Sequence, residues 1–561
     1  DTEDLDGLFS GWDEDKGQYD IDSWQYRDVE VAPAAGQREM FSGEPHSERG
    51  TQITAEHHDH LLKDPRCVFQ ILKRHFARYT PEMVSDVCGM DKDLFVKVAD
   101  TLARNSGRER TSAFCYAVGW TQHTVGVQYI RTAAILQLLL GNIGRPGGGI
   151  LALRGHASIQ GSTDIPTLYN LLPGYLAMPK AATDVDLKTY IELNESASGW
   201  WSQFPNYIVS LLKAYWGDRA TVQNDFCYDY LPHLTGDHSH MTTVADMADG
   251  RIKGYFVMGE NPTVGSMHGA LHRKGLRELE WLVVRDLNLI ETAEFWRDAP
   301  EIERGEVKTE DIATEVFFFP AASHVEKDGT FTNTQRLLQW HHKAVEPPGD
   351  CRSELHFMYH LGIRLKRLYE SSSDPKDRPI LDLAWDYPTH GSIEEPSAEA
   401  VLAEINGWTV DDGKPVSSFQ ELKDDGSTAC GCWIYSGCYA EGVNQPARRR
   451  PGQDQTWVAP EWGWAWPANR RIIYNRASAD PEGRPWSDRK AYVWWDPDQG
   501  KWTGHDVPDF IADRPPSYRA EEGATDLDTL SGIDPFIMQA DGKGWIYAPN
   551  GLLDGPLPTH Y

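Results

Sequence analysis

The chain has 561 residues, of which 40% are hydrophobic and 25% charged, so we expect a soluble globular protein of several domains. Lys and Arg number 54 against 84 Asp and Glu, and the resulting net charge of −30 argues against a nucleic-acid or anionic-membrane partner, since either requires a basic surface. No apolar run reaches the roughly 18 residues that a transmembrane helix needs.

The first 150 residues predict a polar stretch followed by alternating helices and strands. Residues 1–60 are rich in Asp, Gly and Glu, and we expect a surface excursion there. Helical periodicity follows over CVFQILKRHFARY, TPEMVSDVCG and DKDLFVKVADTLARNSG. The apolar run SAFCYAVG (112–119) predicts a buried strand, and a helix is predicted over 125–140. GRPGGG (144–149) lacks the Lys-Ser/Thr of a phosphate-binding loop, so we interpret it as a tight helix–strand connection.

A second alternation of strands and helices is predicted between residues 250 and 322. GYFVMGEN (254–261) predicts a strand, a helix follows over Gly269–Glu280, and further strands are predicted in WLVVRDLN (281–288) and EVFFFPAA (315–322). This spacing favours an α/β fold with doubly wound parallel sheets. Ligands of such sheets bind at the carboxyl ends of the strands. The candidate ligand positions are therefore Gly119–Gln122, Gly259–Asn261, Asp286 and Ala322–Lys327.

Beyond about residue 370 the sequence predicts a long irregular segment in which tryptophans act as apolar anchors. The eight cysteines are too few for a disulfide scaffold. Cys67, Cys88 and Cys115 lie in apolar surroundings and are interpreted as core residues. Three further cysteines, at 430, 432 and 438, form a cluster, but a metal site usually has four ligands at a different spacing. The tract AEHHDH (55–60) is interpreted as a solvated helix start rather than a metal site.

The segment ILALRGHASIQGSTDIPTL (150–168) is the most informative for chemistry. A strand-like start runs directly into Arg154, Gly155 and His156, and Gly161 permits a close backbone approach. An arginine after a strand can hold a carboxylate by two parallel hydrogen bonds. A buried ion pair is an equally good interpretation of Arg154 from local sequence alone.

Several motifs resemble the large subunit of formate dehydrogenases, members of the molybdenum- or tungsten-bis-pterin oxidoreductases, which are also called the dimethyl sulfoxide reductase family. They are LRGHASIQGSTD, YAVGWTQHTVG, LLLGNIGRPGGG, VMGENP, VVRDLNLIETAEFW and HVEKDGTFTNTQRLLQW. The later stretches CGCWIYSG, KWTGHDVPDF and PFIMQ resemble the respiratory, membrane-anchored type. The resemblance extends over almost the whole chain in one continuous order.

The resemblance implies oxidation of formate to carbon dioxide at a bis-molybdopterin guanine dinucleotide that carries molybdenum or tungsten. It also implies an iron–sulfur electron-transfer subunit and a membrane cytochrome b subunit as partners in anaerobic respiration, and a periplasmic or other extracytoplasmic location. Family subunits begin with a four-cysteine segment for a 4Fe–4S cluster, followed by the cysteine or selenocysteine that ligates the metal, and they end in a β-barrel. This sequence contains none of these parts, so we expect a middle segment of the catalytic subunit with an incomplete active site.

The resemblance further implies domains and roles. We expect an α/β domain over 1–154, a second, cofactor-binding α/β domain over 155–330, and a long Trp-rich segment over 331–561. The substrate residues implied are Arg154, which would hold formate, and His156 and Thr163, which would line the same funnel. The cofactor contacts implied are Gly119, Gln122, Gly259, Glu260, Asn261, Asp286, Lys327 and Glu354.

Three alternatives remain open at the level of sequence. A helix N-cap is the less favoured interpretation of Glu260 and Asp286. Another substrate such as nitrate would suit the same family. A non-catalytic scaffold subunit of a respiratory complex would keep the fold without the chemistry.

Overall fold

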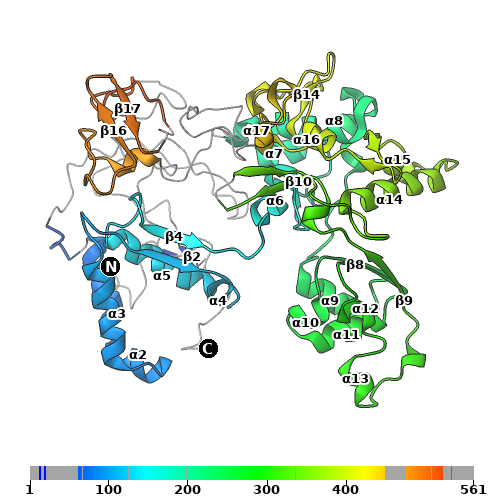
Figure 1. The fold of residues 1–561 in the computed structure, drawn as a ribbon, viewed down its shortest axis with the longest axis horizontal. Coiled ribbons are helices and arrows are strands. Elements are labelled where there is room, and N and C mark those ends of the chain that lie inside the picture. The colour runs from blue at the N-terminus through cyan, green and yellow to red at the C-terminus, as the bar shows by residue number, and fades with distance from the viewer. Residues whose placement is uncertain are drawn as a thin grey trace.

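The computed structural model describes most of residues 61–448 and 474–521 (Figure 1). The described residues are 12–13, 15, 18–19, 61–65, 67–123, 125–195, 200–334, 337–448, 474–506, 508, 510–521 and 532–533. The expected surface excursion over 1–60, with its AEHHDH tract, therefore lies almost wholly outside them. Within it only the antiparallel pair β1 (Trp12–Asp13) and β2 (Gln18–Tyr19) is described as regular structure.

Residues 67–153 form an α/β unit. Its elements are α1 (Val68–Phe76), α2 (Pro81–Cys88), α3 (Lys92–Arg104), β3 (Ala113–Tyr116), α4 (Val118–Thr121), α5 (Gly126–Leu139) and β4 (Gly149–Ala152). Thr80 and Asp91 cap α2 and α3, since their side chains accept the N–H groups of Met83 at 3.2 Å and Leu94 at 2.9 Å. Strands β3 and β4 are parallel and are connected through α5, which confirms the predicted order of elements.

The connection between α5 and β4 is tight, as predicted for GRPGGG. Gly148 lies so close to Asn142 that a Cβ atom would stand 1.9 Å from the Asn142 carbonyl oxygen. Asn142 is fully buried, and its amide donates to Gln137 Oε1 at 2.9 Å. Gln137 in turn donates to the carbonyls of Ser112 and Gly149 at 2.8 and 2.6 Å, so one buried amide network ties helix α5 to the starts of both strands.

The prediction that residues 112–119 form a buried strand is wrong in its burial. Ala113 and Cys115 on one face of β3 are exposed, whereas Phe114 and Tyr116 on the other face are half-buried against Trp120. Cys88 is also exposed, so the core interpretation fails for two of the three cysteines. The physical reason is that β3 and β4 make a two-stranded sheet, and no further described layer covers its second face.

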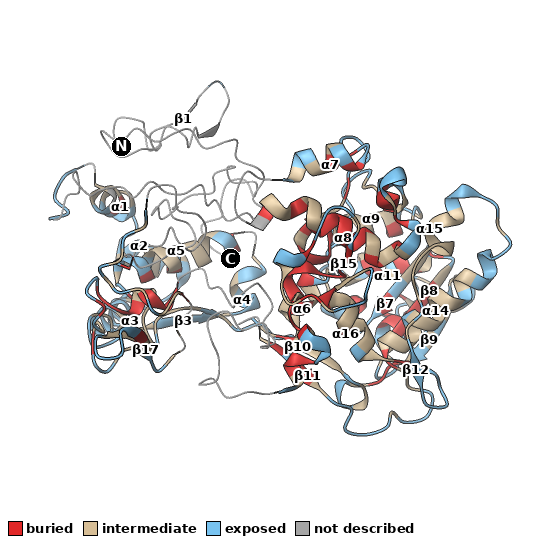
Figure 2. Ribbon diagram, turned by 90° about the horizontal axis from the view of Figure 1, so that it is seen from above, coloured by how far each residue is buried: buried red, intermediate tan, exposed pale blue. Residues whose placement is uncertain are grey.

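Residues 155–248 contribute helices and the centre of the largest core. Their elements are α6 (Ile159–Asp164), β5 (Leu171–Leu172), β6 (Leu176–Ala177), α7 (Leu187–Asn194), α8 (Phe204–Trp216) and α9 (His240–Ala248). Helix α8 is apolar on nearly every side, which is the pattern of a helix that is enclosed in a core. Figure 2 shows the buried residues concentrated around this helix.

A three-stranded parallel sheet follows, in the order β7 (Gly254–Met258), β8 (Trp281–Asp286) and β9 (Glu315–Pro320). Its connections and cover are α10 (Pro262–Gly265), α11 (Gly269–Arg277), α12 (Glu291–Glu294), α13 (Pro300–Glu303) and α14 (Glu354–Tyr369). Leu276 of α11 and Met247 of α9 pack with Val257 and Val284 on one face. On the other face, Phe357 of α14 lies 5.4 Å from Phe319, measured between ring centroids. The structure thus confirms a mixed α/β fold with small parallel sheets.

The remaining elements are short. They are β10 (Gly329–Thr332), β11 (Leu338–His341), α15 (Arg378–Leu381), β12 (Thr389–His390), β13 (Glu395–Pro396), α16 (Ala398–Asn406), β14 (Trp408–Thr409), β15 (Thr428–Ala429), α17 (Gln445–Arg448), β16 (Val493–Asp496) and β17 (Lys501–Gly504). Trp433 acts as a core anchor in this irregular region: it is 2% exposed and stacks on Tyr207 with ring centroids 4.2 Å apart.

A buried amide organises the irregular chain near Trp433. The Asn406 carboxamide oxygen accepts the N–H groups of Gly437 at 2.7 Å and Tyr439 at 2.9 Å. Its nitrogen donates to the carbonyls of Gly407 and Val416. All four hydrogen-bonding positions of this buried side chain are therefore filled, which replaces part of the backbone pairing that a sheet would provide.

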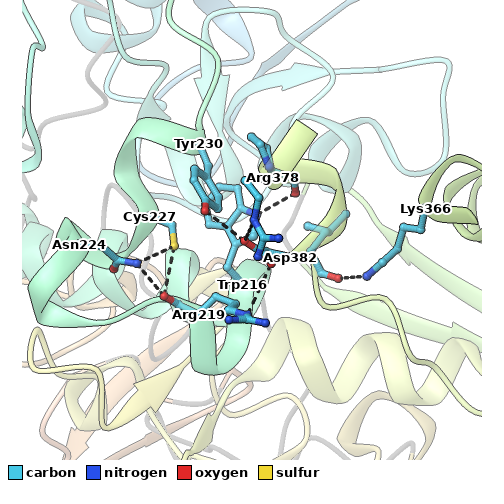
Figure 3. A network of polar contacts seen from close by, with 10 residues as sticks. Trp216, Arg219, Asn224, Cys227, Tyr230, Lys366, Arg378 and Asp382 are labelled. Atoms are coloured by element: carbon cyan, nitrogen blue, oxygen red, sulfur yellow. Dashed lines mark hydrogen bonds and ion pairs between the residues drawn. The ribbon is translucent and has the colours of Figure 1, made fainter. Parts of the chain in front are cut away.

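A polar network around Asp382 ties residues 216–230 to α15 (Figure 3). The carboxylate accepts from Arg378 Nε at 3.0 Å and from the Tyr230 hydroxyl at 3.1 Å, and it pairs with Arg219 at 3.5 Å. Trp216 Nε1 donates to the Pro379 carbonyl at 3.1 Å. Because the Asp382 side chain is only 5% exposed, these donors stabilise a carboxylate that would otherwise be costly to desolvate.

The same network adjoins a strained turn. Asp225, Phe226 and Cys227 have φ angles of 48°, 53° and 64°, in the left-handed region that non-glycine residues rarely adopt. The Arg219 carbonyl accepts from Asn224 Nδ2 at 2.8 Å and from Cys227 Sγ at 3.3 Å (Figure 3). These hydrogen bonds offset part of the cost of the turn.

Residues 474–521 return to the first α/β unit, and Figure 1 shows β16 and β17 on the same side of the molecule as α3 and β4. Ser487 Oγ donates to Glu109 at 2.5 Å, and Lys490 Nζ donates to the Pro146 carbonyl at 3.2 Å. The guanidinium of Arg145 lies 5.9 Å from the Trp486 ring centroid. Segments more than 340 residues apart in sequence are thereby joined.

Candidate functional site

The first group of candidate residues lies at the carboxyl edge of the β3–β4 sheet. The strands are parallel, so the residues that follow Tyr116 and Ala152 leave the sheet at the same edge. Gly119 lies in α4 and is exposed, and a Cβ atom there would meet nothing within 4 Å. Gln122 ends α4 with an exposed side chain. Within the described ranges, the two positions therefore offer open backbone and a side-chain amide without a hydrogen-bond partner at this edge.

Arg154 follows β4 at the same edge and is exposed. Its backbone N–H donates to the Ala152 carbonyl at 3.0 Å. Its guanidinium has no hydrogen bond or ion pair with any residue in the described ranges. The interpretation as a buried ion pair is therefore wrong within those ranges, and the fork of N–H donors remains open to an anion.

His156 and Thr163 lie on the segment that Arg154 begins. The Ser158 N–H donates to His156 Nδ1 at 3.1 Å, so the neutral imidazole carries its proton on Nε2. His156 is exposed, whereas Thr163 is half-buried in α6 and donates its hydroxyl to the Ile159 carbonyl at 3.0 Å. The exposed Nε2 proton of His156 is thus free to donate, while the Thr163 hydroxyl proton is used within its own helix.

The second group lies at the carboxyl edge of the β7–β8–β9 sheet. Gly259 follows β7 with φ of 70°, and its N–H donates to the Arg285 carbonyl at 2.9 Å. A Cβ atom at Gly259 would meet nothing within 4 Å. Glu260 is exposed, and its carboxylate accepts the Ser266 hydroxyl at 3.0 Å. The N-cap position of α10 is Asn261 rather than Glu260, so the cap interpretation of Glu260 is wrong.

Asn261 is the most connected residue of this edge. Its carboxamide oxygen accepts the Thr292 hydroxyl at 2.7 Å and the Thr292 N–H at 3.2 Å. Its nitrogen donates to the Glu291 carboxylate at 2.6 Å, and a backbone hydrogen bond to that carboxylate, together with this contact, holds the pKa of Glu291 below its usual value. Asn261 therefore locks the loop after β7 to the start of α12.

Asp286 ends β8 and is half-buried. Its carboxylate accepts the Leu287 N–H at 2.6 Å, and its carbonyl accepts the Ala321 N–H at 3.0 Å. Helix α12 begins at Glu291, and its N-cap is Ile290, four residues after Asp286, so Asp286 is not a helix cap either. Most of the acceptor capacity of this carboxylate is left for other donors.

Lys327 and Glu354 are in direct contact. The ammonium group pairs with the Glu354 carboxylate and donates to the Ala322 carbonyl at 3.1 Å. Ser353 caps α14 by accepting the His356 N–H at 2.9 Å, which places Glu354 in the first turn of that helix. Both side chains remain partly exposed, at 26% for Lys327 and 42% for Glu354.

The structure brings the candidates together within each edge, and the hairpin β10–β11 links the two edges. Strand β10 begins two residues after Lys327 and ends at Thr332, whose N–H donates to Ser158 Oγ at 3.2 Å, directly before α6. A strand advances about 3.3 Å per residue, so Lys327 and Thr332 are at most about 17 Å apart. No contact within the described ranges joins Arg154, His156 or Thr163 to the second edge.

Two residues of this region escaped sequence reasoning. Asp164, the last residue of the IQGSTD run, is fully buried and accepts the Tyr435 hydroxyl at 2.8 Å. Arg285 on β8 is 1% exposed, donates to the carbonyls of Arg352 and Ser353, and stacks 4.6 Å from the Phe357 ring centroid. The sequence did contain a signal for both residues. Arg285 is an ionisable residue inside an apolar strand, and Asp164 is one at the end of a run of small residues, so both were candidates for burial.

The cysteine cluster at 430, 432 and 438 is fully buried, and burial raises the pKa of each of these thiols. Among the described residues no group of three or more potential ligands is arranged to hold a metal ion. None of the helices in the described ranges combines the length and the apolar character required to cross a membrane.

A family model and several sequence relatives indicate the class of protein to which this chain is similar. Residues 317–362 match the family model described as molybdopterin oxidoreductase, and this stretch runs from β9 through the β10–β11 hairpin into α14. The sequence relatives below agree with this match over the whole chain. Over residues 317–362 the chain is thus similar to the molybdopterin oxidoreductase family.

The relatives are formate dehydrogenase major subunits. The chain is 38% identical over 577 residues to the formate dehydrogenase-O major subunit of Escherichia coli, which covers 99% of this chain and 52% of that protein. It is 39% identical over 579 residues to formate dehydrogenase 2 subunit alpha of Nitratidesulfovibrio vulgaris, with the same two coverages. The chain thus spans about half the length of the curated relatives it matches.

A solved structure, acetylene hydratase from Pelobacter acetylenicus, is similar at a TM-score of 0.30 and 16% identity over 53% of this chain and 35% of that chain. So low a TM-score supports no conclusion about shared geometry.

Proposed function

We propose that this chain forms part of the catalytic subunit of a respiratory formate dehydrogenase. The reaction converts formate to carbon dioxide, one proton and two electrons. The observation that carries the proposal is Arg154: an exposed guanidinium at the carboxyl edge of a parallel strand, without a partner in the described ranges, in a chain homologous to formate dehydrogenase major subunits. Formate dehydrogenase major subunits align with 99% of this chain, which supports formate oxidation as the reaction class.

Arg154 would bind the formate carboxylate through two parallel hydrogen bonds. Formate offers little besides its carboxylate for recognition, so the orientation of the C–H bond depends on a planar fork rather than on a point charge. Arginine also remains charged at every physiological pH, which keeps the site ready for an anion.

His156 and Thr163 would line the funnel to this position. The Nε2 proton of His156 is available for a hydrogen bond to an anion because Nδ1 is occupied by the Ser158 N–H. Thr163 contributes a side chain whose hydroxyl is bound within its own helix, so we assign it a packing and access role.

The second edge suits a pterin–guanosine dinucleotide. Gly259 leaves open space for a phosphate-bearing chain to approach the backbone, Lys327 offers a cation, and Asp286 offers a carboxylate with free acceptor positions. Glu260, Asn261 and Glu354 complete the proposed contacts there, and Gly119 and Gln122 contact the pterin at the first edge. When bound, this cofactor with its molybdenum or tungsten supplies the two-electron acceptor. We also propose that each small sheet is the core of a doubly wound domain.

The electrons would pass through iron–sulfur clusters, including a 4Fe–4S cluster, to an electron-transfer subunit and a membrane cytochrome b subunit. An extracytoplasmic, periplasmic location follows from the respiratory assignment and rests on resemblance alone.

The test is Arg154→Lys in the full-length holoenzyme. We expect kcat/KM for formate to fall by about a hundredfold, since one bidentate contact made in the transition state is lost, while the pterin and metal content per chain stays at the parent level. Arg251→Lys is the matched control, because Arg251 is exposed and pairs with Asp249 at 3.1 Å. Loss of cofactor from Arg154→Lys with unchanged turnover per bound cofactor would show that Arg154 is structural.

A further inference from the structure

A buried hydroxyl–carboxylate cluster lies beneath the segment that carries the proposed formate residues. Asp164 ends α6 and is fully buried. Its Oδ2 accepts the Tyr435 hydroxyl at 2.8 Å, and its Oδ1 accepts Gln160 Nε2 at 2.9 Å. Tyr175 also hydrogen-bonds to this carboxylate, while its hydroxyl oxygen accepts from Gln160 Nε2 at 3.0 Å. The carboxylate is therefore held from several directions at once.

Tyr435 connects α6 to a second element. Its hydroxyl lies 2.9 Å from Thr332 Oγ1 at the end of β10, and Tyr435 itself is 2% exposed. Burial and the Asp164 carboxylate raise the pKa of Tyr435 well above its ordinary value, so the hydroxyl stays protonated and donates. Because a hydroxyl has one proton, the bond to Thr332 is one in which the threonine hydroxyl donates to Tyr435.

The other end of α6 is held by the same strand. The Thr332 N–H donates to Ser158 Oγ at 3.2 Å. Gly161 lies so close to β10 that a Cβ atom would stand 3.1 Å from Thr332 Cβ and 2.8 Å from Ser158 Oγ. Cys432 Sγ, three residues before Tyr435, contacts the Asp164 carbonyl at 3.6 Å. Helix α6 is thus fastened at both ends to residues that the chain reaches only 174–271 positions later.

We infer that Tyr435 and Asp164 are positioning residues for formate oxidation, acting through α6 on Arg154 and His156. This inference rests on the proposed function. A six-residue helix has little stability of its own, so its orientation is set by these side-chain contacts. The segment Arg154–Ser158 enters α6 directly, and the rotation of α6 sets where the guanidinium points. A displacement of about 1 Å at a reacting centre can cost up to about a hundredfold in rate.

The test is Tyr435→Phe in the full-length holoenzyme. Removing the hydroxyl leaves the ring in its core but frees Asp164 and Thr332 from each other. We expect kcat per bound cofactor to fall about tenfold and KM for formate to change less than twofold, because Arg154 still supplies the charge. We also expect the primary deuterium isotope effect on kcat with deuterated formate to increase, because a misaligned C–H bond makes its cleavage more rate-limiting.

Tyr228→Phe is the matched control. Tyr228 is 2% exposed in the same core, and its hydroxyl donates to the Asp184 carbonyl at 3.1 Å, away from α6. We expect Tyr228→Phe to lower the thermal midpoint as much as Tyr435→Phe does, with unchanged kcat and isotope effect. If both variants behave alike in turnover and isotope effect, the inference is overturned.

Thr332→Val provides a second variant of nearly the same shape, with an expected threefold loss of kcat and an increased isotope effect. If Tyr435→Phe yields no folded protein, an unchanged isotope effect in Thr332→Val overturns the inference. Failure of the proposed function is distinguishable, since in that case the unsubstituted, cofactor-loaded protein itself shows no formate-dependent turnover.

Discussion

At the scale of single residues, the pair Lys327–Glu354 holds a proposed cofactor-binding group in place. The Lys327 ammonium is held by the Glu354 carboxylate and by the Ala322 carbonyl at 3.1 Å. Because both side chains are partly exposed, water screens the pair, and it contributes little to folding. We therefore expect substitution at Lys327 to act on ligand binding more than on stability.

Lys327→Met should weaken retention of the pterin dinucleotide about tenfold, because a charge-assisted hydrogen bond to phosphate contributes about 1.5–3 kcal/mol. Guanine released per chain after dialysis of the full-length protein measures this retention. Lys253→Met is the control: Lys253 is 61% exposed and pairs with Glu280 at 3.8 Å, at the opposite end of the same sheet. Equal cofactor retention in the two variants would contradict a phosphate contact by Lys327.

Sequence reasoning reached some of these residues and missed others for a physical reason. Arg154 follows an apolar strand and Asp286 ends one, so their place at a sheet edge was predictable from local pattern. The contact between Asp164 and Tyr435 joins residues 271 positions apart, and no local periodicity encodes such a pairing. The roles assigned to Arg154, His156 and Thr163 remain predictions.

At the scale of elements, helix α16 carries a carboxyl group that titrates unusually. Glu404 accepts the Tyr387 hydroxyl at 2.8 Å, and burial raises the pKa of its side chain to about 7 from an ordinary 4.5. The folded protein therefore keeps this proton up to about pH 7, whereas the unfolded chain releases it near 4.5. The free energy of unfolding consequently falls as pH rises between these values, by about 3 kcal/mol at most.

Glu404→Gln should remove this contribution to the pH dependence. Relative to the parent, the variant gains stability as pH rises from about 5 to about 7, and the difference levels off above that range. Chemical denaturation at several pH values measures the effect. Glu399→Gln on the same helix is the control, since Glu399 is exposed. Parallel pH profiles for the parent and Glu404→Gln would show that Glu404 titrates normally.

Periodicity predicted most of the regular elements well. The helix expected over 125–140 is α5 (Gly126–Leu139), and the strands expected in 254–261, 281–288 and 315–322 are β7, β8 and β9. The left-handed turn at Asp225–Cys227 was not predictable, because it contains no glycine and depends on hydrogen bonds to Arg219. The burial of β3 was overestimated because composition does not reveal how many layers cover a sheet.

At the scale of the whole molecule, distant segments assemble in a way that the order of motifs does not reveal. Residues 474–521 pack against the unit formed by 67–153, through contacts such as Lys490 with the Pro146 carbonyl. The proposed domain boundaries at residues 154 and 330 remain a prediction. They were drawn from the order of motifs along the chain, which does not include these long-range contacts. The net charge of −30 likewise bears on partners, and the proposed capture of formate would depend on local groups such as Arg154.

The proposed oxidation of formate is tested most directly by the stoichiometry of turnover in the full-length, cofactor-loaded protein. Isotopically labelled formate is supplied with a one-electron dye, and labelled carbon dioxide and reduced dye are measured together. We expect one carbon dioxide for every two dye molecules reduced, with no reduction when formate is omitted. Protein that contains its metal and pterin but yields no labelled carbon dioxide from formate would contradict it.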